Sequence, residues 1–168
     1  TAIVTGGTKG LGMGIAATLA YYGANVVLTA RTAKDCETMS KEITERYVRG
    51  SNKVIGIPAD SGKQEDIDNV ISVTVKEFGE LNILVNNAGI SGKTAKILTD
   101  ECDESNFEKV INTNLKGVFL FAKSAAKQMV AQGKGGKIIN IASVGGIVGG
   151  PGVVAYGASK AGVISLTK

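Results

Sequence analysis

Histidine is absent from the 168 residues. This absence excludes a histidine general base, a Ser-His-Asp triad within the chain and a histidine-ligated metal ion. Cysteine is scarce as well, because Cys36 and Cys102 are the only two and match neither a zinc-binding nor a redox spacing. We therefore expect no metal site, and two ordinary thiols in a reducing compartment.

Long apolar runs and one-sided charge are also missing. No stretch of 18 apolar residues and no signal peptide occur, so we expect a cytoplasmic, soluble protein without membrane contact. The net charge is only +4 and the lysines are scattered, which argues against nucleic-acid binding. A weak positive balance suits small molecules that carry phosphate. Hydrophobic residues make up 43% and charged residues 20%, a composition typical of a globular protein.

Glycine is the residue in excess, with 23 copies that are mostly clustered. Residues 2–5 (A-I-V-T) predict a short buried strand, followed by T-G-G-T-K-G-L-G at Thr5–Gly12 and by apolar residues at helical spacing up to Gly23. A strand, a glycine loop and a helix suit a dinucleotide phosphate, because the backbone comes close and the helix N-terminus offers free N–H groups. A tight turn between a buried strand and a helix is the alternative interpretation.

The spacing of these glycines narrows the motif. The pattern G-x-G-x-x-G does not fit, and the phosphate-binding pattern of nucleotide hydrolases fails because Met13 stands where lysine is required. The pattern that fits is T-G-x-x-x-G-x-G, with Gly6, Gly10 and Gly12.

The end of the second predicted strand, at residues 25–29, bears on the choice of cofactor. A protein selective for NAD usually has an acid about 20 residues past the glycine loop, whereas an arginine accommodates the 2′-phosphate of NADP. This position holds Ala30 and then Arg31, and Lys9 in the glycine loop approaches the same phosphate. Two cations and no acid predict NADP(H) over NAD(H). A solvated loop charge is the alternative for Arg31.

Further strands are predicted at 53–58, 82–85 and 137–141, and helices at roughly 33–49, 64–78 and 105–131. Thr32 and Asp35 predict a capping box for the first of these helices. Alternating strands and helices with short connections predict an α/β fold, a doubly wound parallel sheet with strand order 3-2-1-4-5. We expect residues 1–168 to form a single domain.

Several polar residues follow predicted strands and so meet at one edge of the sheet, where such folds bind ligands. They are the glycine loop, Arg31, Asp60, Asn86 and Ser143. Asp60 is expected either to bind the amino group of an adenine or to form a plain turn. Asn86 and its neighbour Asn87 either tie strands together or hold the loop against a ligand.

Residues Ser143–Lys160 read S-V-G-G-I-V-G-G-P-G-V-V-A-Y-G-A-S-K. On a helix, Tyr156 and Lys160 lie one turn apart on the same face. A free tyrosine has a pKa of about 10, and a neighbouring ammonium favours the phenolate, which suits the phenol for general acid–base work. Ser143 then hydrogen-bonds the oxygen that Tyr156 protonates. The alternative interpretation of Tyr-x-x-x-Lys is an ordinary helix face.

Together, T-G-G-T-K-G-L-G, N-N-A-G, N-L-K-G-V-F and a serine thirteen residues before Y-G-A-S-K resemble the short-chain dehydrogenase/reductase family, in its single-domain, NADP-preferring type. The resemblance implies a dinucleotide-binding Rossmann fold. It also implies that Tyr156 is the general acid/base, that Ser143 orients the substrate carbonyl, that Lys160 promotes ionisation of the phenol and binds the nicotinamide ribose, and that Asn114 holds a water in the proton relay.

The resemblance implies a cofactor site formed by twelve residues. These are Gly6, Thr8, Lys9, Gly10, Leu11, Gly12, Arg31, Asp60, Asn86, Ala88, Tyr156 and Lys160.

The implied activity is NADP(H)-dependent interconversion of a ketone and a secondary alcohol. A 3-oxoacyl thioester is the first substrate hypothesis, with keto-sugars, steroids and small ketones as others. A cofactor-binding regulator or scaffold without turnover is the alternative from another class. The long apolar helix at 105–131 and the habit of the family predict a homo-oligomer.

The chain starts inside a strand and stops inside a helix, so we expect it to be truncated at the C-terminus. Members of the family carry a sixth and a seventh strand beyond this point.

We predict that residues 1–168 alone fold poorly and show little turnover, because the fifth strand is then an unprotected edge. The measurement is denaturant unfolding and carbonyl reduction by the isolated piece. Full activity with cooperative unfolding would contradict this prediction.

Overall fold

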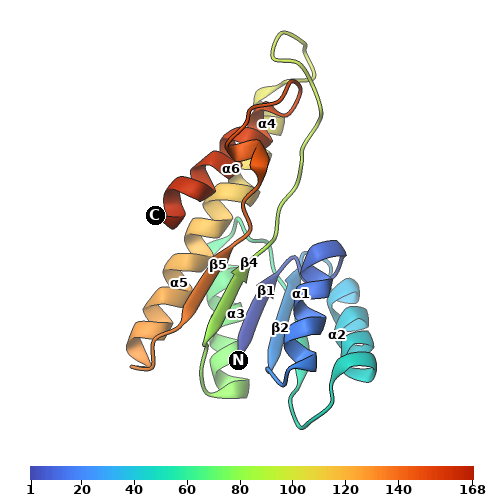
Figure 1. Ribbon diagram of the computed structural model, residues 1–168, viewed down its shortest axis with the longest axis vertical. Coiled ribbons are helices and arrows are strands. Elements are labelled where there is room, and N and C mark those ends of the chain that lie inside the picture. The colour runs from blue at the N-terminus through green and yellow to red at the C-terminus, as the bar shows by residue number, and fades with distance from the viewer.

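The computed structural model describes all 168 residues, and its five strands form one sheet (Figure 1). The strands are β1 (Ala2–Thr5), β2 (Val26–Ala30), β3 (Val54–Pro58), β4 (Ile83–Asn86) and β5 (Lys137–Asn140). Every neighbouring pair is parallel, and the strand order is β3-β2-β1-β4-β5. The prediction of a doubly wound parallel sheet with order 3-2-1-4-5 is therefore confirmed.

Six α-helices accompany the sheet. They are α1 (Gly10–Tyr21), α2 (Ala33–Tyr47), α3 (Gln64–Phe78), α4 (Glu104–Ile111), α5 (Gly117–Ala131) and α6 (Val154–Thr167). The single helix predicted at 105–131 is wrong in its middle, where a π-helical segment, Asn112–Lys116, separates α4 from α5. None of the helices combines the length and the apolar character needed to cross a lipid bilayer.

The sheet has a hydrophobic core on each of its two faces. Adjacent residues of a central strand point into different cores, because side chains alternate along a strand. Ile3 and Leu84 point to one face, where they pack with Phe121 of α5 and with α3. Val4 and Val85 point to the other face, towards α1 and α2. Both faces of the central strands are thus buried, which explains why β1 is apolar at consecutive positions.

The capping box predicted at the start of α2 is wrong. Thr32 occupies the N-cap position but makes no hydrogen bond through its side chain. The carboxylate of Asp35 lies instead 3.5 Å from the ammonium of Lys9 in the glycine loop. Asp35 therefore pairs with a lysine of the glycine loop and does not take part in a capping box.

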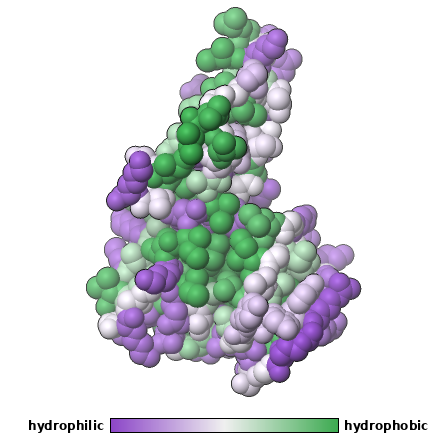
Figure 2. All heavy atoms as spheres, in the orientation of Figure 1, coloured by the Kyte–Doolittle hydropathy of each residue, from purple (hydrophilic) through white to green (hydrophobic).

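The strands all end at the same edge, and α4, the beginning of α6 and the loop at 91–103 rise beyond it (Figure 1). At the opposite side of the sheet from α5, β5 is uncovered. Ile139 is 48% exposed, and Figure 2 shows apolar atoms gathered over this face. Strand β5 pairs only with β4, so its outer edge is open, as the sequence predicts.

The buried aromatic ring of α5 provides a test of this core. We predict that Phe121→Ala lowers the free energy of unfolding by about 3–5 kcal/mol, because it leaves a cavity between α5 and the sheet. Phe119→Ala, on the same helix but 46% exposed, is the matched control and is expected to cost much less. Equal losses in denaturant titrations would contradict this packing.

Candidate functional site

The glycine loop after β1 needs its glycines for two different reasons. At Gly12, a Cβ would collide with the carbonyl oxygen of Gly6 and the side-chain amide of Asn87, so the helix start and the loop touch directly. At Gly10, φ is +52° and nothing lies within 4 Å of the Cβ position. The missing side chain of Gly12 permits close packing within the protein, whereas the missing side chain of Gly10 leaves open space at the N-terminus of α1.

Thr5 and Asn87 hold the glycine loop against the end of β4. The hydroxyl of Thr5 accepts hydrogen bonds from the backbone N–H groups of Asn87 and Ala88, both at 3.0 Å. The side-chain amide of Asn87 donates to the carbonyls of Thr5 at 2.9 Å and Gly6 at 3.2 Å. The sequence analysis did not assign Thr5 a role, although its position at the end of β1 is a signal for one.

Asn86 ties strands together. Its side-chain amide donates to the carboxamide oxygen of Asn140 at 2.9 Å, across the β4–β5 pair, and more weakly to the carbonyl of Val118. Only 2% of Asn86 is exposed. Of the two alternatives for this residue, the contacts favour the strand tie.

Asp60 closes a turn after β3. Its carboxylate accepts from the backbone N–H of Gly62 at 2.9 Å, and its own N–H donates to Asp66 at 2.8 Å. The neighbours of Asp60, Ala59 and Ser61, line the cleft described next, whereas Asp60 does not. The contacts favour the turn alternative.

A cleft of about 270 Å³ lies at the carboxyl edge, between the glycine loop and the ends of β2 and β4. Five of the predicted cofactor residues line it: Gly6, Thr8, Lys9, Arg31 and Ala88. The other predicted cofactor residues, Gly10, Leu11, Gly12, Asp60, Asn86, Tyr156 and Lys160, lie outside its lining. The loop around Gly10 and the groups around Tyr156 therefore flank this cleft as separate parts of the site.

Of the lining residues that the sequence analysis did not assign to the cofactor site, two bear on the chemistry of the cleft. Asp35 is its only acid and pairs with Lys9, so the folded cleft holds a carboxylate beside the two cations, although the end of β2 itself has none. Thr29, at the end of β2, is 1% exposed, and its hydroxyl has no hydrogen-bond partner. A buried hydroxyl without a partner is unusual. It marks a polar position beside the cleft that the protein itself does not satisfy.

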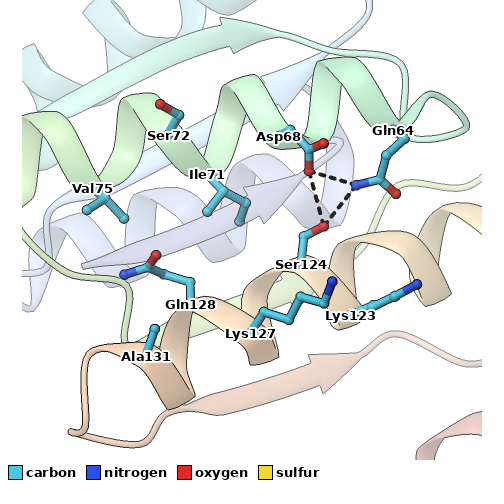
Figure 3. A pocket seen from close by; sticks show the side chains of 10 residues that line it. All are labelled: Gln64, Asp68, Ile71, Ser72, Val75, Lys123, Ser124, Lys127, Gln128 and Ala131. Carbon is cyan, nitrogen blue, oxygen red and sulfur yellow. Dashed lines mark hydrogen bonds between the residues drawn. The ribbon is translucent and has the colours of Figure 1, made fainter.

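A larger hollow, of about 790 Å³, lies elsewhere. It separates α3 from α5, and Figure 3 shows Gln64, Asp68 and Ser124 joined across it by hydrogen bonds. Its lining contains none of the predicted site residues. We therefore place the candidate site at the carboxyl edge of the sheet, where the polar groups converge.

Ser143 and Tyr156 meet around Gly145. The hydroxyl oxygen of Ser143 and two ring carbons of Tyr156 all lie within 4 Å of the Cβ position of Gly145. Ser143 follows β5 and accepts a hydrogen bond from the N–H of Gly145 at 3.1 Å, whereas Tyr156 lies in the first turn of α6. The glycine thus allows the serine hydroxyl and the tyrosine ring, from separate elements, to lie around one backbone position.

Lys160 lies under this pair. Its ammonium is 5.8 Å from the centre of the Tyr156 ring and donates to the carbonyl of Ile141 at 2.6 Å. Only 4% of the residue is exposed, and burial lowers the pKa of the Lys160 ammonium from its ordinary value. The sequence spacing correctly predicted that Tyr156 and Lys160 share one helix.

Asn114 lies in the π-helical segment and is completely buried. Its amide oxygen accepts from the N–H of Ile90 at 2.8 Å, and its amide nitrogen donates to the carbonyl of Ile90 and to the hydroxyl of Ser159. Asn114 therefore joins the loop after β4 to α6. π-Helical insertions of this kind are frequent at functional sites.

Comparison with known proteins agrees with this geometry. A family model described as short chain dehydrogenase matches residues 1–168. The chain belongs to the short-chain dehydrogenase/reductase family. This dehydrogenase family binds nicotinamide dinucleotides, and the cleft fits such a group, because it combines two cations with an unsatisfied hydroxyl and is flanked by the open position at Gly10.

Relatives of this chain differ in what their names say they act on. The chain is 37% identical over 163 residues to L-rhamnose-1-dehydrogenase of Scheffersomyces stipitis. The aligned region covers 97% of this chain and 62% of that protein. The chain is 41% identical over 169 residues to a 3-oxoacyl-acyl-carrier-protein reductase of Staphylococcus aureus (strain N315), covering 100% of this chain and 65% of the relative. The chain thus spans less than two thirds of the length of these relatives.

Solved structures show the same likeness. Levodione reductase superposes with a TM-score of 0.91 at 34% identity, over 99% of this chain and 62% of the other. NAD⁺-bound xylitol dehydrogenase superposes with a TM-score of 0.90 at 30% identity, over 99% of this chain and 61% of the other.

The direct contact between Gly12 and Gly6 can be tested. We predict that Gly12→Ala lowers the free energy of unfolding by about 1–3 kcal/mol and weakens binding of a nicotinamide dinucleotide, because the loop must move to admit the methyl group. Gly14→Ala is the control in the same helix, since its Cβ position is open, and a gain of about 0.5–1 kcal/mol is expected there. A harmless Gly12→Ala would contradict the described contact.

Proposed function

We propose that this protein is an NADP(H)-dependent oxidoreductase that interconverts a ketone and a secondary alcohol. The observation that carries this proposal is the convergence of Ser143 and Tyr156 around Gly145, above the buried ammonium of Lys160. Residues 1–168 are proposed to form the dinucleotide-binding domain of the protein.

A bound nicotinamide cofactor supplies or accepts the hydride at the carbonyl carbon. Tyr156 transfers the proton: in reduction, its phenol gives a proton to the carbonyl oxygen as the new C–H bond forms. The ketone is reduced, the cofactor is oxidised, and the phenolate regains its proton from solvent. In the opposite direction, the phenolate accepts the proton of the alcohol.

Ser143 orients the reacting oxygen. Its hydroxyl oxygen already accepts a hydrogen bond from Gly145, so its own hydrogen is free to be donated. A donor placed beside the phenol stabilises negative charge that develops on the substrate oxygen.

Lys160 is proposed to favour the phenolate form of Tyr156 and to bind the nicotinamide ribose. One of its three N–H groups is used by the carbonyl of Ile141, which leaves two for a ligand and the phenol. The nearby backbone of Gly89, whose Cβ position is 3.7 Å from the ammonium, leaves room at this point.

Asn114 is proposed to act mainly by position. Both hydrogens of its amide group are used by Ile90 and Ser159, and its oxygen already accepts from Ile90. Only the second lone pair of the amide oxygen therefore remains for a hydrogen bond from a water in the proton relay.

The cations of the cleft support a preference for NADP(H). Lys9 and Arg31 line the same cleft, and arginine suits a phosphate group well. Asp35 opposes them, because a carboxylate beside Lys9 repels a 2′-phosphate. We therefore propose that NADPH is preferred by a smaller margin than the two cations alone suggest.

The similarity to a 3-oxoacyl-acyl-carrier-protein reductase supports a 3-oxoacyl thioester as a candidate substrate. We further propose that the full-length protein is a cytoplasmic homo-oligomer. The free thiols of Cys36 and Cys102 fit a reducing compartment, and the exposed Phe119 and Val130 of α5 offer apolar surface to a second copy. A silent cofactor-binding regulator remains the second hypothesis, and the intact Ser143, Tyr156 and Lys160 argue against it.

Removal of the phenol hydroxyl tests the reaction. Tyr156→Phe is predicted to lower kcat by about 10²–10⁴-fold, because the proton donor is lost, with little change in the Kd for NADPH. The measurement is NADPH oxidation by the full-length protein against a panel of ketones. Equal rates for the variant and the parent protein would contradict the role of Tyr156.

Neutralisation of Asp35 tests the cofactor preference. We predict that Asp35→Asn raises the ratio of kcat/KM for NADPH over NADH by about five-fold, the size expected for one exposed charge pair. Glu37→Gln is the matched control, because Glu37 lies on the same helix and pairs with Lys41. A preference of the parent protein for NADH would show that the assignment of Lys9 and Arg31 is wrong.

A further inference from the structure

The helix α6 packs closely against the π-helical segment. A Cβ at Gly162 would lie 2.7 Å from a side-chain carbon of Leu115, so the two elements are in direct contact. Figure 1 shows α6 beside the junction of α4 and α5, where this segment lies. One row of α6 is buried at Ala155, Ser159 and Val163, each four residues from the next. Ser159 is therefore a hydroxyl in the middle of a row whose other members are aliphatic.

The hydroxyl of Ser159 has two partners, and they belong to different parts of the chain. It donates to the carbonyl of Tyr156 at 2.7 Å and accepts from the side-chain amide of Asn114 at 3.1 Å. The first is the local bond that a serine in a helix often forms with the preceding turn. The second joins residues 45 positions apart, and both Ser159 and Asn114 are 0% exposed. A local capping habit of serine does not explain this second partner.

The bond to Ser159 completes the hydrogen bonding of the Asn114 amide nitrogen. The other hydrogen of this nitrogen goes to the carbonyl of Ile90 at 2.9 Å, and the amide oxygen accepts from the N–H of Ile90 at 2.8 Å. Without the serine hydroxyl, one N–H of a fully buried amide has no partner, which is costly. Such an amide gains free energy by turning towards another acceptor or by admitting water. The hydroxyl of Ser159 therefore holds the Asn114 side chain in its orientation.

The orientation of Asn114 bears on the groups around Gly89. The amide oxygen of Asn114 lies 3.3 Å from the Cβ position of Gly89, and the ammonium of Lys160 lies 3.7 Å from the same point. The amide and the cation thus converge on one backbone position. A turn of the amide would change the surroundings of this cation and the place of the water proposed to bind Asn114.

We infer that Ser159 is a positioning residue of the proposed reaction. Its hydroxyl fixes Asn114 relative to the turn of α6 that carries Tyr156, and so fixes the path by which the phenolate regains its proton. The inference rests on the proposed function and adds to it a residue that is fully buried and acts through Asn114.

Removal of the hydroxyl without added volume tests this inference. Ser159→Ala in the full-length protein is expected to lower kcat about ten-fold, the size expected for the loss of one buried hydrogen bond, with little change in the Kd of the cofactor. The measurements are steady-state oxidation of NADPH and NADH with a ketone that the parent protein reduces, and a fluorescence titration of the reduced cofactor. Ser159→Thr is expected to keep most of kcat, because threonine retains a hydroxyl that can bond the preceding turn.

Hydrogen exchange supplies a readout that needs neither cofactor nor turnover. The N–H of Ile90 donates to Asn114, so a less constrained Asn114 leaves this N–H less protected. We expect Ser159→Ala to speed its exchange about ten-fold in the ligand-free full-length protein, measured by mass spectrometry of the peptide that contains Ile90.

The matched control is Ser40→Ala. Ser40 forms the same local bond in α2, donating to the carbonyl of Glu37 at 2.9 Å, but its hydroxyl has no partner from another element. This variant is expected to change neither kcat nor the exchange of the Ile90 N–H.

The outcomes separate this inference from the proposed function. Unchanged kcat in Ser159→Ala, a loss of kcat without faster exchange at Ile90, or an equal loss in Ser159→Thr would overturn the inference and leave the proposed function standing. A parent protein that oxidises neither cofactor with any carbonyl compound would overturn the proposed function. In that case faster exchange at Ile90 would still support the hold of Ser159 on Asn114, and unchanged exchange would overturn it as well.

Discussion

The two-sided burial of the parallel sheet is the constraint on which the rest of the structure depends. Strands such as β1 have helices on both faces, so consecutive residues must be apolar and polar groups are excluded from the strand centres. Parallel pairing also brings every strand to the same edge at its carboxyl end. Polar chemistry therefore collects at one edge, where loops from distant parts of the sequence are neighbours.

Close backbone contact at that edge is maintained by a small set of buried hydrogen bonds. Thr5 and Asn87 hold the glycine loop to the end of β4, and Asn114 holds the following loop to α6. These groups leave few unsatisfied donors in a buried region, where each would be costly. Because they fix the loops, the relative positions of the cleft, Ser143 and Tyr156 follow from the fold itself.

Lys160 illustrates how this arrangement supports the proposed chemistry. A buried ammonium is unfavourable unless it finds partners, and its nearest partners are the carbonyl of Ile141 and the face of the Tyr156 ring. This position of the cation supports the proposed role of Lys160 in favouring the phenolate. The same burial lowers the pKa of the Lys160 ammonium, so the free energy of its charged form is sensitive to a ligand in the site.

The sequence predicted the elements well, because hydrophobic periodicity and glycine clusters are local signals. The bounds of α3 and the strand order agree with that prediction. It did not predict the π-helical turn around Asn114, since the insertion depends on contacts with Ile90 and Ser159. The role of Asp35 was also mistaken, because its pairing with Lys9 joins the first turn of α2 to the glycine loop, and the sequence does not contain the distance between them.

The central claim is that a hydride reaches a substrate carbon at this edge of the sheet. The most direct measurement uses NADPH labelled with deuterium at C4 of the nicotinamide, in each of the two stereochemical forms, together with the full-length protein and a ketone that it reduces. Mass spectrometry is predicted to find one deuterium on the carbinol carbon of the product with one labelled form and none with the other. Alcohol that carries no deuterium with either form would contradict the account.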